Sequence, residues 1–273
     1  MESEIDLERR FGGIARLHGA AALERLRVAH VGVIGIGGVG AWAAEALARS
    51  GVGRLTLIDL DHVAESNINR QIHALDATLG QAKVQAMAER IAQINPGCRV
   101  RCVEEFVTVD NVADIVPDCD GIIDAIDQVR AKAAIIACCR QRGQAVVTTG
   151  GAGGRTDPSR ILIDDLSRTT QDALASKVRA ELRRHHRFSR DPKRKFGVAC
   201  VYSPEQAPPA DALACDADER GLHGLNCAGY GSSVMVTASF GMFAAARLVS
   251  MILRPEGRKV KSSPGATELK VST

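Results

Sequence analysis

The sequence predicts an α/β fold of the Rossmann type, with a doubly wound, mostly parallel sheet, helices on both faces and a C-terminal extension. Three features predict it: short apolar runs rich in β-branched residues, helical stretches that alternate with those runs, and a glycine cluster directly after the first run. Strands covered on both faces are apolar throughout, and alternating strands and helices form parallel sheets. We therefore expect strands and helices to alternate through most of the chain.

The composition fits one large domain. At 273 residues the chain can bury a substantial core, and its aromatic content of 3% leaves small aliphatic side chains to fill that core. The formal net charge of +3 is too small to indicate a polyanionic partner by itself. The distribution of charge is therefore more informative than its sum.

The first predicted unit is a strand, a glycine turn and a helix. The strand covers residues 31–34, and the helix covers residues 41–49. Between them Gly35, Gly37 and Gly40 follow the pattern G-x-G-x-x-G, with Gly38 in the same loop. Glycines at this spacing let the backbone turn sharply and aim amide N–H groups at a phosphate. The unit predicts a nucleotide site.

A second strand at residues 55–58 ends at Asp59. This aspartate lies about 20 residues beyond the glycines, where a carboxylate can accept from a ribose hydroxyl. Further elements are predicted in the order helix 82–95, strand 98–103, short helix 110–116, strand 121–124, helix 128–142, strand 145–149, strand 161–163, a helix from residue 169 and an edge strand at 196–203.

The polar residues after Asp59 distinguish between nucleotides. The glycine pattern alone would usually indicate a nicotinamide-dependent dehydrogenase, whose cofactor ring needs an apolar slot. Arg70 and Lys83 are better matched to ATP, because fixed cations offset the charge that builds on its phosphates. We expect the nucleotide to contact Asp61, Asn67, Asn69, Arg70, Gln71 and Lys83.

Asp127 follows the strand at 121–124. Open parallel sheets bind ligands at the carboxyl ends of their strands, so Asp127 is placed to face a ligand. A loop aspartate is more often a helix cap or a solvated charge, and from the residues alone that interpretation comes first.

Five motifs resemble, in order, the adenylating domain shared by ubiquitin-activating enzymes and the bacterial ThiF/MoeB/HesA group. They are Gly35-Ile36-Gly37-Gly38-Val39-Gly40, Asp59-Leu60-Asp61-His62-Val63, Ser66-Asn67-Ile68-Asn69-Arg70-Gln71, Gly80-Gln81-Ala82-Lys83 and Asp124-Ala125-Ile126-Asp127. The segments 10–17, 146–154 and 226–228 resemble the tRNA threonylcarbamoyladenosine dehydratase branch of that superfamily. The resemblance covers nearly the whole chain.

This resemblance implies a chemistry and a set of roles. ATP would activate the threonyl carboxylate of threonylcarbamoyladenosine in the tRNA anticodon loop, after which ring closure expels AMP. Arg70, Lys83 and Asp127 would be catalytic, with Asp127 holding Mg²⁺. A homodimer is implied too, in which an arginine of the N-terminal arm reaches the neighbouring subunit's ATP. This chain has Gly12-Gly13 where relatives often carry that arginine, which leaves Arg10 or Arg16.

With the resemblance, the chain divides into four predicted parts. These are an N-terminal helical arm at 1–27, an ATP-binding adenylating domain at 28–166, a substrate- and tRNA-binding part at 167–254 and a disordered tail at 255–273.

Residues 179–195, which begin at Arg179 and end at Lys195, contain eight Lys or Arg residues and only two acids. Such a run can track a phosphate backbone, and the phenylalanine and two histidines inside it favour nucleic acid. A solvated helix face is the simpler alternative. We expect this segment to bind tRNA.

The chain has eight cysteines, but no signal peptide is evident before Phe11, so we expect reduced thiols and a cytoplasmic location. No pair is spaced C-x-x-C, and we expect no structural zinc. Cys227 precedes an apolar helix whose positive end favours the thiolate. Two roles are open for it: a covalent one, as a thioester or as a sulfur carrier for a cysteine desulfurase partner, and simple packing near the pocket.

The uncharged stretch 228–246 is long enough for a membrane helix to be considered. Its glycines, serines and threonine make it weakly apolar, which favours a buried or interface helix over membrane association.

Three functions from different classes are compatible with these features. The first is an ATP-dependent tRNA dehydratase, and the second is an adenylating activator of a ubiquitin-like sulfur-carrier protein. The third is a non-enzymatic relay in cysteine sulfur traffic. A nicotinamide-dependent dehydrogenase is a fourth interpretation, which these features favour less than the other three.

Overall fold

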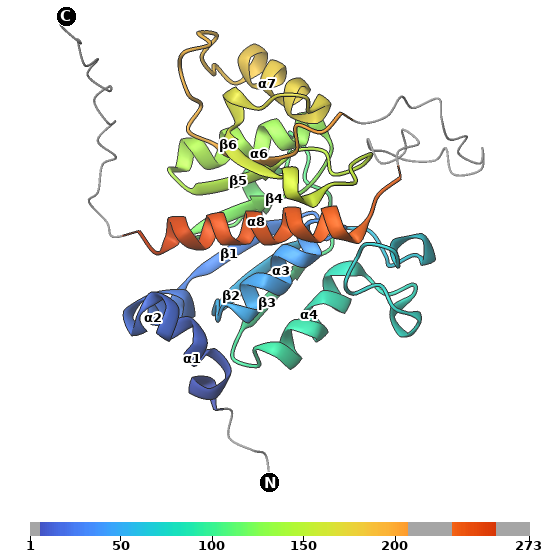
Figure 1. Ribbon diagram of the computed structural model, residues 1–273, viewed down its shortest axis with the longest axis vertical. Coiled ribbons are helices and arrows are strands. Elements are labelled where there is room, and N and C mark those ends of the chain that lie inside the picture. Colours follow the sequence, from blue (N-terminus) through green and yellow to red (C-terminus); the bar gives the residue numbers. More distant parts are fainter. Residues whose placement is uncertain (1–5, 207–230, 255–273) are drawn as a thin grey trace, which may run out of the picture.

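The computed structural model describes residues 6–206 and 231–254 (Figure 1). Its helices are α1 Leu7–His18, α2 Ala20–Val28, α3 Gly40–Arg49, α4 Lys83–Ile94, α5 Val112–Ile115, α6 Val129–Arg142, α7 Ala173–His185 and α8 Val234–Ile252. Its strands are β1 His30–Ile34, β2 Arg54–Ile58, β3 Arg99–Val103, β4 Gly121–Asp124, β5 Ala145–Thr149, β6 Leu162–Asp165 and β7 Ala199–Tyr202. These elements agree with the predicted strands and helices to within a few residues at each end.

The seven strands form one sheet in the order β3-β2-β1-β4-β5-β7-β6. Every pairing is parallel except that of β6 with β7. The predicted doubly wound, mostly parallel sheet is therefore confirmed. One detail was wrong: the strand predicted as an edge at 196–203 lies inside the sheet, between β5 and β6. Three of its four residues are buried, as suits a strand with neighbours on both sides.

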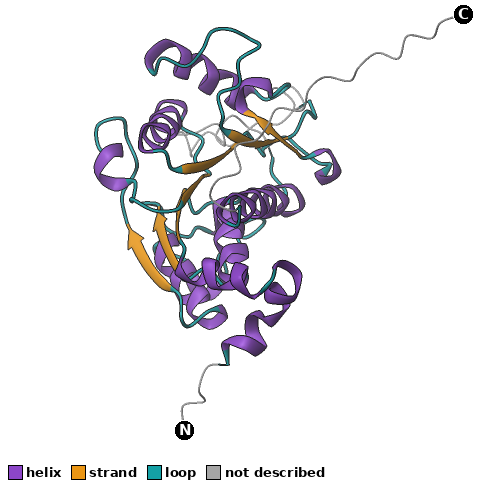
Figure 2. Ribbon diagram, turned by 90° about the vertical axis from the view of Figure 1, so that its left-hand side faces the viewer, coloured by secondary structure: helices purple, strands orange, loops and turns teal. Residues whose placement is uncertain are grey.

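Helices cover both faces of this sheet (Figure 2). On one face α3, α4 and α8 contribute to a hydrophobic cluster with the central strands. On the other face α5, α6 and α7 form a second cluster. Because both faces are covered, the edge formed by the carboxyl ends of the parallel strands is left open to a ligand.

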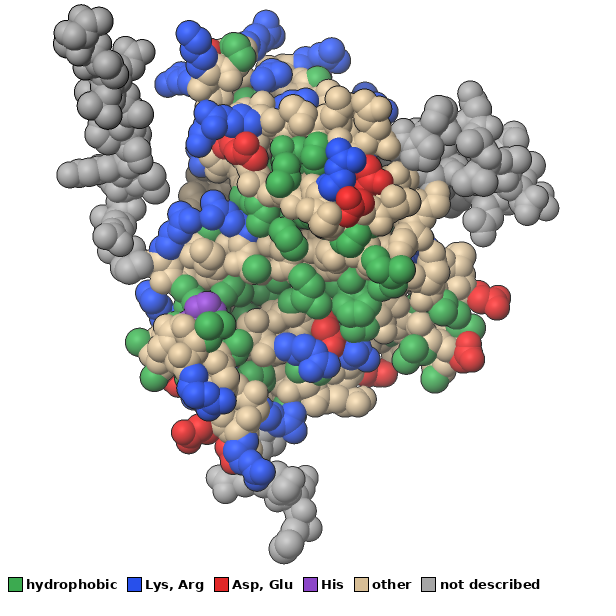
Figure 3. All heavy atoms as spheres, in the orientation of Figure 1, with side chains coloured by type: hydrophobic (Ala, Val, Ile, Leu, Met, Phe, Trp, Pro, Cys, Tyr) green, Lys and Arg blue, Asp and Glu red, His purple; other side chains and the backbone are tan. Residues whose placement is uncertain are grey.

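Helix α8 lies across the sheet beside α3 (Figure 1). Val236, Phe240, Ala244 and Leu248 are fully buried and recur every four residues, so they form one stripe facing the core. The length and apolar composition of α8 would also suit a membrane span, but a core helix has the same properties and buries such a stripe. Its outer face leaves apolar side chains exposed, including Met235 and Phe243. Hydrophobic side chains form a band across the molecule at the level of α8 (Figure 3).

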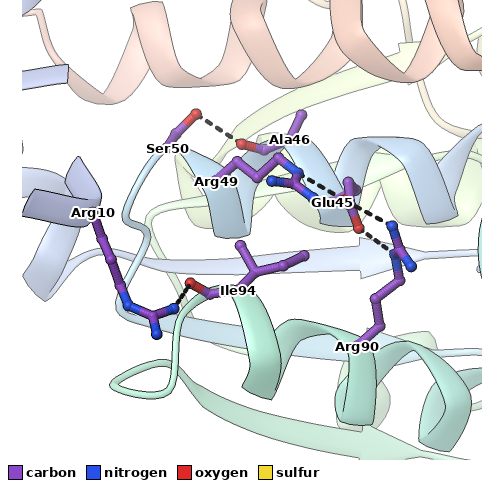
Figure 4. Close-up of polar contacts among 7 residues, drawn as sticks. All are labelled: Arg10, Glu45, Ala46, Arg49, Ser50, Arg90 and Ile94. Carbon is purple, nitrogen blue, oxygen red and sulfur yellow. Dashed lines mark hydrogen bonds and ion pairs between the residues drawn. The ribbon is translucent and has the colours of Figure 1, made fainter. Parts of the chain in front are cut away.

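The N-terminal arm consists of two helices that change direction at Gly19, whose φ is 92°. Arg10 of α1 donates from Nη1 to the carbonyls of Gln93 and Ile94, at 3.2 and 2.9 Å (Figure 4). A guanidinium at this place satisfies carbonyls that the end of α4 leaves unpaired. Arg10 is thus held at the end of α4 in its own chain, whereas Arg16 is exposed.

A charged cluster lies beside that contact. Glu45 of α3 is 2% exposed, and its carboxylate pairs with Arg49 at 2.7 Å and with Arg90 at 2.7 Å (Figure 4). Two guanidinium groups therefore compensate the buried carboxylate and join α3 to α4.

Gly241 lets α8 approach α3 closely. A β-carbon at this position would lie 2.4 Å from the carbonyl oxygen of Val39 and 2.9 Å from the backbone nitrogen of Ala43. We expect Gly241→Ala to lower the free energy of unfolding by about 1–3 kcal/mol, because backbone atoms cannot yield as a flexible side chain would. Urea unfolding measures this, with Ser250→Ala on the exposed side of α8 as a control expected to change it by less than about 0.5 kcal/mol. Equal stability of the two variants would show that α8 can shift at no cost.

Candidate nucleotide-binding site

Three strands bring the site together at their carboxyl ends. β1 lies between β2 and β4, and Ile34 is in register with both Ile58 and Asp124. Beyond the strands, the amide of Gly35 donates to the carbonyl of Ile58 at 2.9 Å, and the amide of Ala125 donates to that of Ile34 at 2.9 Å. The glycine loop, Asp59 and the loop that carries Asp127 therefore begin side by side at one edge of the sheet.

The glycines of the loop serve two different purposes. Gly40 allows α3 to start directly over the turn, since a β-carbon there would lie 1.8 Å from the carbonyl oxygen of Gly35. Gly37 instead faces open space, where a β-carbon would meet no atom within 4 Å. A ligand can approach the backbone only at such an uncovered position, so we infer that the phosphates would pass Gly37.

Asp59 fixes the loop from the neighbouring strand. Its carboxylate accepts from the amide of Ile36 at 2.6 Å through Oδ2 and from the amide of Asp61 at 2.9 Å through Oδ1. Burial raises the pKa of Asp59, while Lys83 opposes that rise. Each carboxylate oxygen retains a lone pair, so the group can also accept from a ribose hydroxyl.

Lys83 is the buried cation of the site. Its side chain is 8% exposed, and its ammonium group lies 2.8 Å from Oδ2 of Asp61, whose side chain is 53% exposed. Its backbone amide also donates to the carbonyl of Asp61, at 3.0 Å. One carboxylate therefore holds the lysine at the start of α4, and the ammonium group retains further N–H donors for a phosphate.

Arg70 lies against the glycine loop. Its Nη1 donates to the carbonyl of Ser66 at 2.7 Å and to Oδ1 of Asn69 at 2.8 Å. A β-carbon at Gly38 would lie 3.2 Å from the Cγ of Arg70. Burial lowers the pKa of this guanidinium, which still remains charged at neutral pH.

The remaining predicted nucleotide contacts shape the segment around Arg70. Asn67 is buried and accepts from the amide of Ala64 at 3.1 Å, which closes the turn η1 Glu65–Asn67. Asn69 donates to the carbonyl of Ser232 at 2.9 Å, next to the start of α8. Gln71 is buried, and its Oε1 has no partner among the residues described.

Trp42, which the sequence analysis did not select, donates from Nε1 to the carbonyl of Arg70 at 3.0 Å.

Asp127 stands apart from these contacts. It is half-buried just past β4, and within residues 6–206 and 231–254 no group forms a hydrogen bond or ion pair with its carboxylate. No set of three His, Cys, Asp or Glu side chains that could hold a metal occurs in those ranges. A metal here would have one carboxylate from the chain and would take its other ligands from phosphates and water. That donor set fits Mg²⁺, which keeps several waters and often binds through one or two carboxylates and a nucleotide.

A buried ion pair supports the loop that carries Asp127. Lys132 of α6 is 2% exposed in its side chain, and its Nζ lies 3.1 Å from Oδ1 of the fully buried Asp124. The same Nζ donates to the carbonyls of Asp124 and Ile126, at 3.1 and 2.8 Å. Thr148 donates to the other carboxylate oxygen at 2.7 Å. Burial raises the pKa of Asp124, and Lys132 opposes the rise. The sequence analysis did not select this pair, although Lys132 stands in a run of alanine and isoleucine that could have indicated a buried cation.

The cations of the basic segment 179–195 fall into two groups, those that pack within the protein and those that are exposed. Arg179 is half-buried and donates to the Thr169 hydroxyl, while the Arg183 guanidinium lies 5.3 Å from the ring centroid of Phe196. These two arginines support the packing of α7. The other cations of the segment are exposed. Cys227, the fourth residue predicted to be catalytic, lies outside the described residues.

This fold and edge define a nucleotide-binding α/β protein of the adenylating type, and the chain belongs to the ThiF family, whose model matches residues 10–269. Within that family it resembles the tRNA threonylcarbamoyladenosine dehydratases. It is 49% identical over 256 residues to the enzyme of that name from Escherichia coli (strain K12), covering 92% of this chain and 96% of the relative.

Solved structures of the E. coli dehydratase have the same fold as this chain. The crystal structure of the E. coli dehydratase TcdA in complex with ATP has a TM-score of 0.82 and 47% identity, covering 91% of this chain and 96% of that one. The complex of the same enzyme with AMP has a TM-score of 0.80 at the same identity and coverage. The family resemblance deduced from the motifs is confirmed.

The two glycine roles predict opposite phenotypes. Gly37→Ala should leave the urea midpoint unchanged and weaken ATP binding at least about tenfold, because the methyl group enters the uncovered space. Gly40→Ala should lose about 3 kcal/mol of stability or more, because its methyl group meets a backbone oxygen. Calorimetric titration with ATP and urea unfolding measure these effects, with Gly97→Ala, in the turn after α4, as a control for both. Unchanged ATP affinity in Gly37→Ala would contradict this placement of the phosphates.

The buried ion pair gives a second prediction. Lys132→Met leaves the Asp124 carboxylate without its cation, and we expect the free energy of unfolding to fall by about 3–5 kcal/mol. Lys177→Met, at an exposed site on α7, is the matched control and should have almost no effect. A loss below about 1 kcal/mol in urea unfolding of Lys132→Met would show that the pair is not needed.

Proposed function

We propose that this chain catalyses the ATP-dependent dehydration of N6-threonylcarbamoyladenosine in tRNA to its cyclic form. The observation that carries the proposal is the combination, at one sheet edge, of an uncovered glycine turn with the cations of Arg70 and Lys83. This edge occurs in a chain that is similar over nearly its whole length to an enzyme named for that dehydration.

The reaction has two steps. An oxygen of the threonyl carboxylate attacks the α-phosphorus of ATP, and pyrophosphate leaves with the electron pair of the broken P–O bond. A nucleophilic atom of the neighbouring carbamoyl group then attacks the activated acyl carbon, the C–O bond to AMP breaks, and one proton is released. The carboxylate oxygen departs in AMP, so the nucleoside loses the elements of water. The solved complexes of the E. coli enzyme with ATP and with AMP support a reaction that begins with one and ends with the other.

The residues of the edge have separable roles in this reaction. Asp59 orients the ribose, and the amides around Gly37 approach the phosphates. Lys83 and Arg70 stabilise the negative charge that develops as pyrophosphate departs. Because both cations are already held by Asp61, Ser66 and Asn69, little reorganisation is needed when ATP binds.

We assign Mg²⁺ to Asp127. Bound there, the ion would neutralise charge on the phosphate oxygens. Two observations support this assignment: the half-buried carboxylate at the edge has no hydrogen-bond partner among the residues that the structure describes, and Lys132 holds the loop that carries it.

Ring closure is intramolecular and needs no thiol. Burial raises the pKa values of Cys98 and Cys139, to about 11 and about 12, and also those of Cys102, Cys119 and Cys200. These cysteines are therefore poor nucleophiles. We assign a covalent role, or sulfur exchange with a cysteine desulfurase, to Cys227, the cysteine that the sequence places just before the apolar helix. Full activity of Cys227→Ser would overturn that assignment.

We propose that the protein works as a cytoplasmic homodimer, in which Arg16 is the arm residue left to reach the partner's nucleotide. The exposed apolar side chains of α8 support self-association, since patches of this kind mark interaction sites. Sedimentation of the purified protein at micromolar concentration tests the dimer, and a monomer would contradict it.

The decisive assay follows AMP and pyrophosphate release from ATP with tRNA that carries threonylcarbamoyladenosine, with unmodified tRNA as control. We expect release only with the modified tRNA. We expect Asp127→Asn to slow it by about 10²–10³-fold and to raise the Mg²⁺ concentration needed, while its melting temperature stays unchanged. Asp114→Asn, exposed on α5, is the control.

Absence of AMP release with modified tRNA would overturn the proposed function. If AMP is released with a protein that ends in Gly-Gly and not with tRNA, the chain is instead an activator of a sulfur carrier. Wild-type rates in Asp127→Asn would remove the metal role alone.

A further inference from the structure

A cavity lies away from the nucleotide edge. It has a volume of about 410 Å³ and is formed by the end of α6, the chain after α7 and the chain entering β7. Four cations line it, together with an aromatic side chain: Arg140, Arg187, Arg194, Lys195 and Phe188. Arg140 lies outside the basic segment recognised in the sequence. Lys and Arg side chains gather over this end of the molecule, around α7, in Figure 3.

These cations have no anionic partner within the described residues. No carboxylate lines the cavity, and none of the four takes part in an ion pair there. The nearby acid Glu181 faces His185, at 3.9 Å. Four like charges around one cavity repel each other and together attract an anion.

The walls of the cavity are fixed by packing. Phe188 meets the buried ring of Phe196 edge to face, with ring centroids 5.0 Å apart. A β-carbon at Gly197, whose φ is 71°, would lie 3.3 Å from Nη1 of Arg140. Arg187 has a φ of 59°, which is unusual for a residue with a side chain. Strained backbone of this kind persists where the surrounding structure holds it, and it concentrates at binding sites.

The cavity lies at the opposite edge of the sheet from the glycine loop. α6 starts just after Asp127 and ends where Gln144 donates to the carbonyl of Pro117, at 2.8 Å, ahead of β4. Arg140 comes eleven residues after Val129, which at 1.5 Å per residue places it roughly 16 Å along α6 from the nucleotide edge. A small ligand confined to this cavity therefore cannot reach the nucleotide edge.

We propose that this cavity binds a phosphodiester of the RNA strand whose modified nucleoside reacts at the other edge. The inference rests on the proposed function for its substrate. A stacked nucleic-acid strand rises about 3.4 Å per nucleotide, so about five nucleotides cover the roughly 16 Å along α6 that separate Arg140 from the nucleotide edge. The face of Phe188 offers a base a stacking surface beside the cations. The same chemistry would also accept a free nucleotide, which the test separates from RNA.

The test is RNA binding by the full-length protein, measured as fluorescence anisotropy of labelled tRNA at several salt concentrations. The variant Arg140→Gln/Arg194→Gln should bind at least about tenfold more weakly at 0.15 M salt. The slope of log affinity against log salt should fall by about two, one for each lost phosphate contact. Arg99→Gln, an exposed cation on β3, is the matched control and should keep wild-type affinity.

Two further measurements separate the possible outcomes. In the AMP assay, the KM for modified tRNA should rise about tenfold while the KM for ATP changes less than twofold. Unchanged affinity and salt slope in the double variant, with a wild type that binds and converts tRNA, would overturn the inference. Binding of free AMP that is lost in Arg140→Gln would also overturn it in favour of a nucleotide site. A wild type that binds RNA through this cavity without releasing AMP would overturn the proposed function and leave the inference standing.

Discussion

The close contact between Gly40 and the carbonyl of Gly35 is the constraint on which the site depends. Only hydrogen fits in that contact, and with it α3 begins directly above the end of β1. α8 depends on the same arrangement, because Gly241 brings its backbone onto Val39 and Ala43, at the start of α3. Asp59 completes it by holding the amide of Ile36. The turn is therefore fixed from the next helix, from a distant helix and from the adjacent strand, which leaves Gly37 as the uncovered point.

The charges at this edge are arranged before ATP arrives. Lys83 is desolvated but paired with one exposed carboxylate, and Arg70 is held by a carbonyl and an amide oxygen. Each cation is thus held at its working position before the phosphates arrive, so little reorganisation is needed when a phosphate becomes more negative. The pair of Asp124 and Lys132 differs, because both side chains are buried and Lys132 also donates to the carbonyl of Ile126 in the loop that follows. Burial therefore holds the cations at the nucleotide edge in place for a phosphate, whereas the buried pair of Asp124 and Lys132 holds a loop.

The sequence was sufficient to predict the order of the elements and to place the glycine loop and Asp59 at one edge of the sheet. Glycine spacing, β-branched runs and the aspartate after β2 are local signals, and local signals determine strands, turns and their carboxyl ends. The sequence was insufficient to predict features that depend on contacts between residues distant in the chain. The place of β7 between β5 and β6 depends on pairing across the sheet, and the link from Asn69 to Ser232 joins residues distant in sequence. Arg140 belongs to the basic cavity only because α6 ends beside the chain after α7.

In the proposed function, the cations of the cavity bind the RNA, whereas the cations of the nucleotide edge stabilise the reacting phosphates. In the RNA binding that we propose, a contact roughly 16 Å along α6 from the nucleotide edge cannot stabilise charge on the phosphates, but it can hold the substrate while they react. Binding energy from remote parts of a substrate can offset the entropy lost when the reacting groups are brought into line. A free threonylcarbamoyl nucleoside lacks that remote part. Discrimination for the whole RNA then follows from geometry, since only a ligand long enough to reach both edges uses both sets of cations.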